Sequence, residues 1–151
     1  MIKVIDFDIS DKEHYQQALA IRELVFIEEQ QVERALEVEN EAQAHYYLLL
    51  LDGLPIATGR WRKTSRGIKL ERFAVLPQFR NQNYGSILLE HILKQLDSRP
   101  EELYLHAQLK AIPYYERQGF CKQGDMFTEA NIQHYLMIKI KIAEFTSSSS
   151  S

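Results

Sequence analysis

One stretch of this 151-residue chain limits its fold more than any other: an apolar segment that runs through a polar turn into a helical pattern. Residues 68–75 have the composition of a buried strand. The apolar residues of 85–96 recur at helical spacing until Ser98-Arg99-Pro100 stops the pattern. A helix that begins directly after a strand presents the unpaired N–H groups of its first turn at the strand's end, where the helix dipole also favours an anion. The segment therefore predicts an anion site at the start of the helix.

Two residues of this segment strengthen the prediction. Arg80 supplies a cationic, bidentate donor, and Gly85 removes a side chain where a phosphate would approach the backbone. A plainer interpretation stays open, in which the segment is an ordinary strand, turn and helix and Arg80 is a solvated charge. The chain contains neither GxGxxG nor the GxxxxGK of a P-loop, so a dinucleotide or P-loop nucleotide site has no support.

The remaining patterns predict one sheet with helices packed on it. Helices are expected from Ser10, which has capping-box spacing to Glu13, through Phe26, and again over 85–96 and 110–118, the last closed by Gly119. Asp52-Gly53 predicts a hairpin, and 32–44 a loop with at most a short helical piece. The order of elements predicts an α/β (α+β) fold with a mixed, mostly antiparallel sheet and helices on both faces. Strands are expected over 1–8, 45–51, 56–62, 68–75, 103–107, 120–123 and 132–142.

Length and composition fit one domain, residues 1–145, followed by a Ser-rich tail, 146–151, that we expect to be disordered. The net charge of −3, with both signs interspersed, argues against a polyanion binder, so no nucleic acid partner is expected. A single cysteine, Cys121, indicates a reducing compartment. No apolar run approaches the roughly 20 residues that span a bilayer. We therefore expect a cytoplasmic protein with no membrane partner.

The turn resembles the signature of a known family. Arg80-x-x-Asn83-x-Gly85 is similar to Q/R-x-x-G-x-G/A of the GNAT superfamily of acyl-CoA N-acyltransferases, with Asn83 in place of the usual Gly. Asn tolerates positive φ, so the turn can survive the exchange. In that family the strand offers backbone groups to the pantetheine arm of acetyl-CoA, and the turn cradles its pyrophosphate. The resemblance implies the GNAT fold and these contacts with acetyl-CoA: Phe73, Ala74 and Val75 on the strand, and Arg80, Asn81, Gln82, Asn83, Tyr84, Gly85 and Ser86 in the turn.

A second segment, 105–120, resembles the other family hallmark, a strand followed by N-x-x-A-x-x-F/Y-Y-x-x-x-G-F. Gln108 replaces the usual Asn and keeps an amide that can bind acetyl-CoA. Tyr115 falls where many GNAT enzymes have a general acid, which the resemblance implies here, since a phenol can give a proton to the leaving thiolate. Taken alone, a Tyr on a short amphipathic helix is as well explained by core packing.

An acceptor amine must lose a proton before it attacks a thioester, and a carboxylate or imidazole commonly takes it. Glu71, on the strand before the turn, is the first candidate for this general base. It could equally be an exposed strand residue or a partner of Arg72. Other candidates are Glu29, His45, His106 and His134. Cys121 is better explained as a packed thiol than as a nucleophile, and the five histidines show no metal-ligand spacing, so no metal is expected.

Three further segments resemble one branch of the superfamily, the ElaA-like predicted N-acetyltransferases: 22–30, 107–115 and 127–137. The last is similar to F-x-E-x-G-I-x-H-x-x-M, with Asn131 in place of Gly. Glu29, Gln30 and His134 are residue types that could line an acceptor pocket. They could equally be the polar end of a helix and a satisfied strand histidine.

The resemblance implies an enzyme that moves acetyl from acetyl-CoA to a primary amine of a small molecule, peptide or protein, by direct transfer in a ternary complex. Two alternatives stay open. One is a non-catalytic module that binds or senses acyl-CoA. The other is a nucleic-acid binder that uses Arg60-Trp61-Arg62-Lys63, although a solvated strand end explains that cluster as well. Homodimerisation through the last strand is a further open point.

Overall fold

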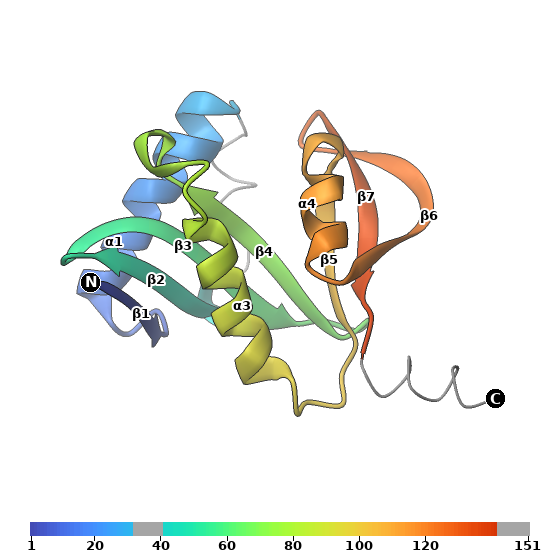
Figure 1. Cartoon of the computed structure of the whole chain (residues 1–151), viewed down its shortest axis with the longest axis horizontal. Helices are drawn as coiled ribbons and strands as arrows, with labels where there is room; N and C mark the ends of the chain where they lie inside the picture. The colour runs from blue at the N-terminus through green and yellow to red at the C-terminus, as the bar shows by residue number, and fades with distance from the viewer. Residues whose placement is uncertain (32–40, 142–151) are drawn as a thin grey trace. The chain divides into compact units, whose positions relative to one another are not determined.

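The computed structural model describes residues 1–31 and 41–141, which fall into two compact units (Figure 1). The first unit comprises Met1–Lys63 and Leu70–Pro100, and the second comprises Thr64–Lys69 and the described residues from Glu101 onward. The expected Ser-rich tail, the end of the predicted last strand and most of the predicted loop at 32–44 lie outside the described residues. The assignment of 1–145 to one domain stays a prediction.

In the first unit the strands lie in the order β1-β2-β3-β4, with antiparallel pairing of β1 to β2 and of β2 to β3. Asp52 and Gly53 both have positive φ, which confirms the predicted hairpin turn between β2 and β3. The elements are β1 (Ile2–Phe7), α1 (Lys12–Arg22), η1 (Glu23–Glu29), η2 (Glu41–Gln43), β2 (His45–Leu51), β3 (Leu54–Lys63), β4 (Ile68–Val75), η3 (Pro77–Phe79) and α3 (Tyr84–Leu96).

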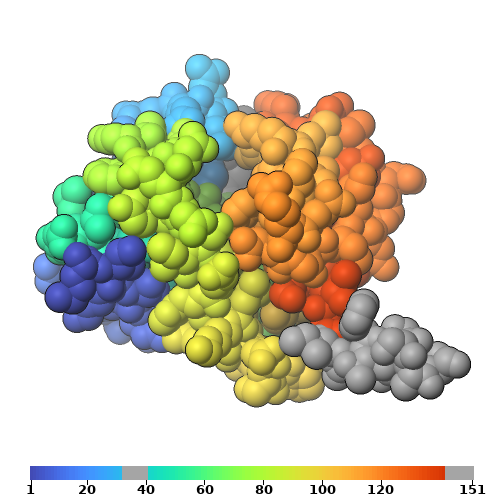
Figure 2. Space-filling model, viewed as in Figure 1, coloured from blue at the N-terminus to red at the C-terminus, as the bar shows by residue number. Residues whose placement is uncertain are grey.

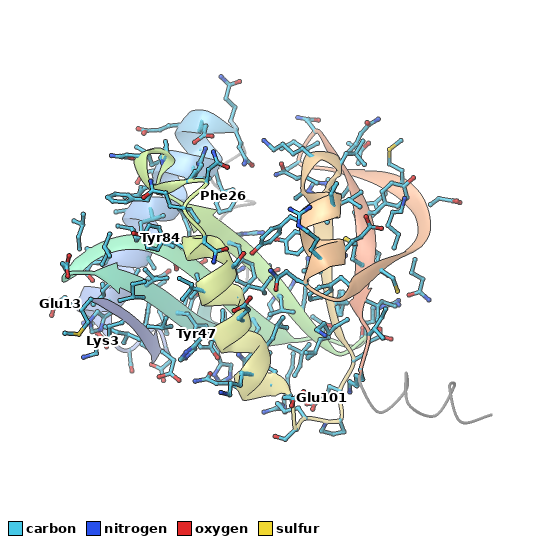
Figure 3. The ribbon with its side chains drawn as sticks, in the orientation of Figure 1. Lys3, Glu13, Phe26, Tyr47, Tyr84 and Glu101 are labelled. Carbon is cyan, nitrogen blue, oxygen red and sulfur yellow. The ribbon has the colours of Figure 1, made fainter. Side chains whose placement is uncertain are left out.

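The unbroken apolar run of β2 is explained by helices on both faces of this sheet. Successive side chains of a strand point to opposite faces. Leu48 packs in a core with Ala18 and Ile21 of α1. Tyr47, labelled in Figure 3, instead donates a hydrogen bond from its hydroxyl to Gln95 Oε1 on α3, 2.7 Å away. Figure 1 shows α1 and α3 on opposite sides of these strands. The predicted two-sided packing is confirmed within this unit.

The start of the first helix differs from the prediction. Asp11 is the N-cap, and its carboxylate accepts from the backbone N–H of His14. Ser10 does not cap the helix, because its hydroxyl and its backbone N–H both bond the carboxylate of Asp8 in the preceding turn. After Arg22 the helix continues as the wider π-helical turn η1, so the predicted helical spacing extends past Phe26, but not in α-helical form.

In the second unit the strand order is β5-β7-β6, and both pairings are antiparallel. α4 contacts β5 and β6, and it lies at the surface of this unit in Figure 2. Gly119, at φ +92°, ends the helical segment as predicted. The elements are β5 (Leu103–Gln108), η4 (Leu109–Ala111), α4 (Ile112–Arg117), β6 (Phe120–Glu129) and β7 (Ile132–Lys139).

Three boundaries in this unit were predicted wrongly. The helix expected over 110–118 is divided into the 3-10 turn η4 and the short α4. β6 continues to Glu129, because a register shift at Gly124, which has φ +79°, absorbs the Gly-Asp pair that resembles a turn. The turn falls instead at Ala130 and Asn131, both with positive φ. β7 ends at Lys139 rather than at residue 142.

Cys121 is exposed, so the prediction of a packed thiol was wrong. Its neighbour Phe120 is buried and contacts the ring of Tyr115 on α4. Because side chains alternate along a strand, Cys121 points away from α4. Among the described residues, no helix is both long and apolar enough to cross a bilayer.

Candidate active site

The predicted anion turn has the local geometry that the sequence indicates. β4 ends at Val75, η3 follows, and α3 begins at Tyr84. Asn81 and Asn83 hold φ values of +61° and +73°, so the prediction that Asn83 can replace Gly in a left-handed position is confirmed. Asn83 is the N-cap of α3, yet its side chain makes no capping hydrogen bond. The Asn83 side chain therefore does not act as the acceptor for the N–H groups of the first turn.

β4 leading to this turn is irregular in a way the sequence did not indicate. Arg72 has φ +59° in the middle of the strand, which interrupts the regular pleat between Glu71 and Phe73. The Phe73 ring packs on Gly59 of β3 so closely that an added Cβ at Gly59 would lie 2.5 Å from Phe73 Cε1. Ala74 is buried, while Val75 is half-buried at the end of the strand. The three predicted pantetheine contacts thus form the last residues of a strand with a fixed local distortion.

Arg80 is held by contacts on both sides of the turn. Its Nε donates to the backbone oxygen of Val75 at 2.9 Å. Its two terminal nitrogens donate to the Glu29 carboxylate at 2.7 and 2.9 Å, in bidentate geometry. The plainer interpretation of Arg80 as a solvated charge is therefore wrong. This ion pair connects Glu29, the last residue of η1, to the turn. About two-fifths of each of the two side chains is exposed.

Glu71 is buried, with 5% of its side chain exposed, and it is bonded by two guanidinium groups. Arg60 donates to Glu71 Oε2 at 2.8 Å from Nε, and Arg62 Nε donates to the same oxygen at 2.9 Å. Arg60 also donates to Glu41 at 2.8 Å, and Arg22 donates to Glu41 at 2.6 Å. The alternative of an exposed Glu71 is thus wrong.

The same contacts correct the expectation for Arg60-Trp61-Arg62-Lys63. Arg60 is 1% exposed and Trp61 is buried, so this is not a solvated strand end. Trp61 Nε1 donates to the hydroxyl of Tyr47 at 3.0 Å, and His45 stacks on the indole at 4.0 Å between ring centroids. Burial lowers the pKa of His45, with a smaller contribution from Arg99. Arg60 and Arg62 thus compensate the buried carboxylate of Glu71, and in this segment it is Lys63, at the end of β3, that is exposed.

In the second unit, Gln108 ends β5 and leads directly into η4. Tyr115 lies on α4, half-buried, with ring contacts to Tyr114 at 5.1 Å and to Phe120 at 5.9 Å. Burial raises the pKa of the Tyr115 phenol, so the hydroxyl keeps its proton at neutral pH. This is the protonation state that a general acid needs.

Four residues of this unit, which we call the His106 cluster, gather on one face of the β5-β7-β6 sheet. Nδ1 of His106 lies 2.8 Å from Glu129 Oε2. Nδ1 of His134 lies 2.7 Å from the backbone oxygen of Ile132. The Phe127 ring contacts both imidazoles, with centroids 4.9 Å from His106 and 5.8 Å from His134. The cluster consists of His106, Phe127, Glu129 and His134.

The cluster and Gln108 share a face. His106 and Gln108 are two residues apart on β5, and Gln108 pairs with His134, which in turn pairs with Phe127. Directly opposed residues of antiparallel strands project to the same side. His134 is 7% exposed and satisfied at Nδ1, as expected for a bonded strand histidine.

Sequence reasoning missed several partners. Glu129 lies within the branch motif at 127–137, which was a usable signal, but no role was given to it. Glu41 follows a stretch without periodicity and carries no local signal. Gln30, predicted beside Glu29, caps the end of η1 through its backbone N–H, which bonds Val25. Within the described residues, no group of three His, Cys, Asp or Glu side chains is placed to hold a metal ion.

Comparisons with known proteins identify the family and the fold of this chain. Residues 10–141 match the family model for the acetyltransferase (GNAT) domain. The uncharacterized N-acetyltransferase YjcF of Bacillus subtilis is 33% identical over 135 residues, which cover 85% of this chain and 94% of YjcF.

Two solved structures establish the fold. Escherichia coli ElaA has a TM-score of 0.82 at 20% identity, over 91% of this chain and 99% of ElaA. An aminoglycoside 6'-N-acetyltransferase complexed with coenzyme A has a TM-score of 0.70 at 16% identity, over 91% of this chain and 96% of that one. The predicted GNAT fold and the ElaA-like resemblance are confirmed. This chain belongs to the GNAT acetyltransferase family.

Proposed function

We propose that this protein is an N-acetyltransferase that moves an acetyl group from acetyl-CoA to a primary amine by direct transfer in a ternary complex. The observation that carries the proposal is the turn between β4 and α3, where Asn83 adopts φ +73° and its side chain leaves the helix start uncapped. An anion is stabilised at a helix start by the N–H groups of the first turn and by the helix dipole. A structural neighbour in complex with coenzyme A supports the same choice of cosubstrate.

In this proposal the residues from Arg80 to Ser86 hold the pyrophosphate, and Phe73, Ala74, Val75 and Gln108 contact the pantetheine arm. The amides of Tyr84 and Gly85 fit the role because they open a helix of 13 residues. Arg80 fits it in a different way from the sequence-based expectation. Its guanidinium is bonded to Glu29 and Val75, so it orders the turn rather than offering a free fork to a phosphate.

Tyr115 is the proposed general acid. Burial raises the pKa of its hydroxyl, which therefore remains protonated and can give its proton to the departing thiolate. Glu71 remains the sequence-based candidate for the general base. Its bonds to two guanidinium groups weaken that candidacy, because a cationic partner on the same oxygen stabilises the carboxylate relative to the protonated acid.

The test begins with isothermal titration of acetyl-CoA and coenzyme A into the full chain, followed by a thiol-release assay with a panel of primary amines. Binding together with amine-dependent thiol release supports the proposal. Binding without release from any amine favours the non-catalytic acyl-CoA module instead. Absence of binding overturns both.

A further inference from the structure

We infer that the His106–Glu129 pair is the proton acceptor for the amine substrate, which makes His106 a general base and Glu129 the residue that positions it. This rests on the proposed function. The inference starts from the juxtaposition on one sheet face of an imidazole, a carboxylate bonded to it, and Gln108, a proposed contact for acetyl-CoA.

The hydrogen bond between the pair fixes which nitrogen exchanges a proton. The His106 hydrogen bond and the charge of Lys69 hold the pKa of Glu129 down to about 2, so its carboxylate is ionised and can only accept. Nδ1 of His106 must therefore carry the hydrogen in the 2.8 Å bond. Nε2 is left as the atom that gains or loses a proton, as in other imidazole–carboxylate pairs.

The surroundings of His106 suit this exchange. Its side chain is 24% exposed, which permits contact with a substrate, and Phe127 contacts its ring edge-to-face. Of the described groups, those whose charge acts on the Glu129 carboxylate are His106 from β5, His134 from β7 and Lys69 from β4. The carboxylate offsets the positive charge that His106 acquires when it takes a proton.

α4 packs on the face of the β5-β7-β6 sheet that is opposite to the His106 cluster. Phe120, which contacts Tyr115 on α4, opposes Lys139 on β7. Residue 139 is an odd number of positions from His134, so the alternation of side chains places α4 on the other face. Within the second unit, the proposed acid Tyr115 and the proposed base His106 therefore belong to opposite faces of one sheet.

The proposed steps balance as follows. Nε2 of His106 takes one proton from the substrate ammonium and later releases it to solvent. The resulting amine attacks the thioester carbon, so that a C–N bond forms and the C–S bond breaks. The Tyr115 hydroxyl gives its proton to the sulfur and recovers one from solvent, while the positively charged nitrogen of the adduct loses its extra proton to solvent. The products are the acetylated amine, free coenzyme A and one proton.

The test uses two simple amines that differ in their need for a base. Butylamine is almost entirely an ammonium ion at neutral pH, whereas trifluoroethylamine is mostly unprotonated because fluorine withdraws electrons. In His106→Asn we expect kcat/KM for butylamine to fall about a hundredfold. For trifluoroethylamine we expect kcat/KM to stay within about threefold, because that amine has no proton to lose before attack. Equal losses for both amines would show a merely structural role and overturn the inference.

The pH profile of kcat/KM in Glu129→Gln is a second measurement, and a change in packing alone would not shift it. With a neutral amide as partner, the protonated imidazole is less stable, so the acidic limb of kcat/KM against pH for butylamine shifts to lower pH. Glu129→Asp should restore part of the wild-type profile. The matched control is Asp11→Asn, which removes the carboxylate bonded to His14 Nδ1 at 2.7 Å and should leave the profile in place. A profile that is unchanged in Glu129→Gln contradicts the inference.

Acetyl-CoA titration of each variant separates this inference from the proposed function. If His106→Asn keeps its affinity for acetyl-CoA and loses kcat/KM for butylamine only, both the proposed function and the base assignment are supported. If the variants keep their affinity for acetyl-CoA and still acetylate amines, but do not lose more kcat/KM for butylamine than for trifluoroethylamine, the base assignment alone is overturned. Wild-type protein that binds acetyl-CoA but acetylates neither amine nor any other of the panel overturns the transferase proposal, and the base assignment with it.

Discussion

The carboxylates at the candidate site are held differently in the two units, although each unit also contains a pair of the other kind, Asp11–His14 in the first and Glu102–Arg66 in the second. In the first unit, Glu29, Glu41 and Glu71 are bonded to guanidinium groups. In the second, Glu129 is bonded to an imidazole. A guanidinium stays protonated at every working pH, so its pairs are fixed charges that hold segments in place. An imidazole changes charge near neutrality. Under the proposed function, the guanidinium pair of Glu29 orders the binding turn, whereas the imidazole pair of Glu129 takes part in proton exchange.

The largest expected effect tests whether Glu71 is a structural charge. Glu71→Gln leaves the buried Arg60 and its neighbour Arg62 short of a counter-charge, so we expect a loss of about 3 kcal/mol in the free energy of unfolding. Urea denaturation measures it, with the exposed Glu90→Gln as the control, expected to change by less than about 0.5 kcal/mol. If the variant is stable but loses the acidic limb of its kcat/KM profile, Glu71 is the base and the comparison fails.

The next effect concerns Tyr115, the proposed general acid in the second unit. Tyr115→Phe keeps the ring that packs on Phe120 but removes the proton, so turnover should fall about a hundredfold while the Kd for acetyl-CoA stays within about twofold. Tyr114→Phe, on the adjacent position of α4, serves as the control. Steady-state rates and calorimetry check both quantities, and an unchanged kcat removes Tyr115 from the mechanism.

A smaller effect is expected at the binding turn of the first unit. Asn83 holds φ +73°, a conformation that a β-branched residue adopts only at a cost of about 1–2 kcal/mol. Asn83→Val should therefore weaken acetyl-CoA binding roughly tenfold, whereas Asn83→Gly should match the wild type within about twofold. Equal affinities of the two variants in calorimetric titration would contradict a backbone-dependent anion site.

The smallest expected effect is the pH dependence contributed by Glu129. Its pKa falls from 4.5 to about 2 on folding, mainly through the hydrogen bond from His106. The pair therefore stabilises the protein fully above the unfolded pKa, and this contribution disappears as the pH falls through the folded pKa. Because the carboxylate is 40% exposed, we expect only about 1 kcal/mol between wild type and Glu129→Gln near neutral pH. Urea unfolding from about pH 6.5 down to about pH 3 should show the difference shrinking; a constant difference would mean that packing, not charge, is responsible.

Much of the fold could be predicted because its signals are local. The strand and helix on either side of the binding turn, the Asp52-Gly53 hairpin and the left-handed Asn83 all follow from the conformational preferences of short segments. The errors occurred where two local signals compete. Ser10 and Asp11 are both good caps, and only the hydrogen bond of Ser10 to Asp8 decides between them. Gly124 resembles a turn residue, but the pairing of β6 with β7 keeps it within a strand.

By itself, the sequence determined the family motifs, the positions of Arg80, Gln108 and Tyr115, and the type of residue available for each role. Only the tertiary structure decided what those residues contact: Glu29 for Arg80, two arginines for Glu71, and Glu129 for His106. The reason is physical. Backbone conformation depends on neighbours along the chain, whereas the protonation of a side chain depends on charges that folding brings from distant segments.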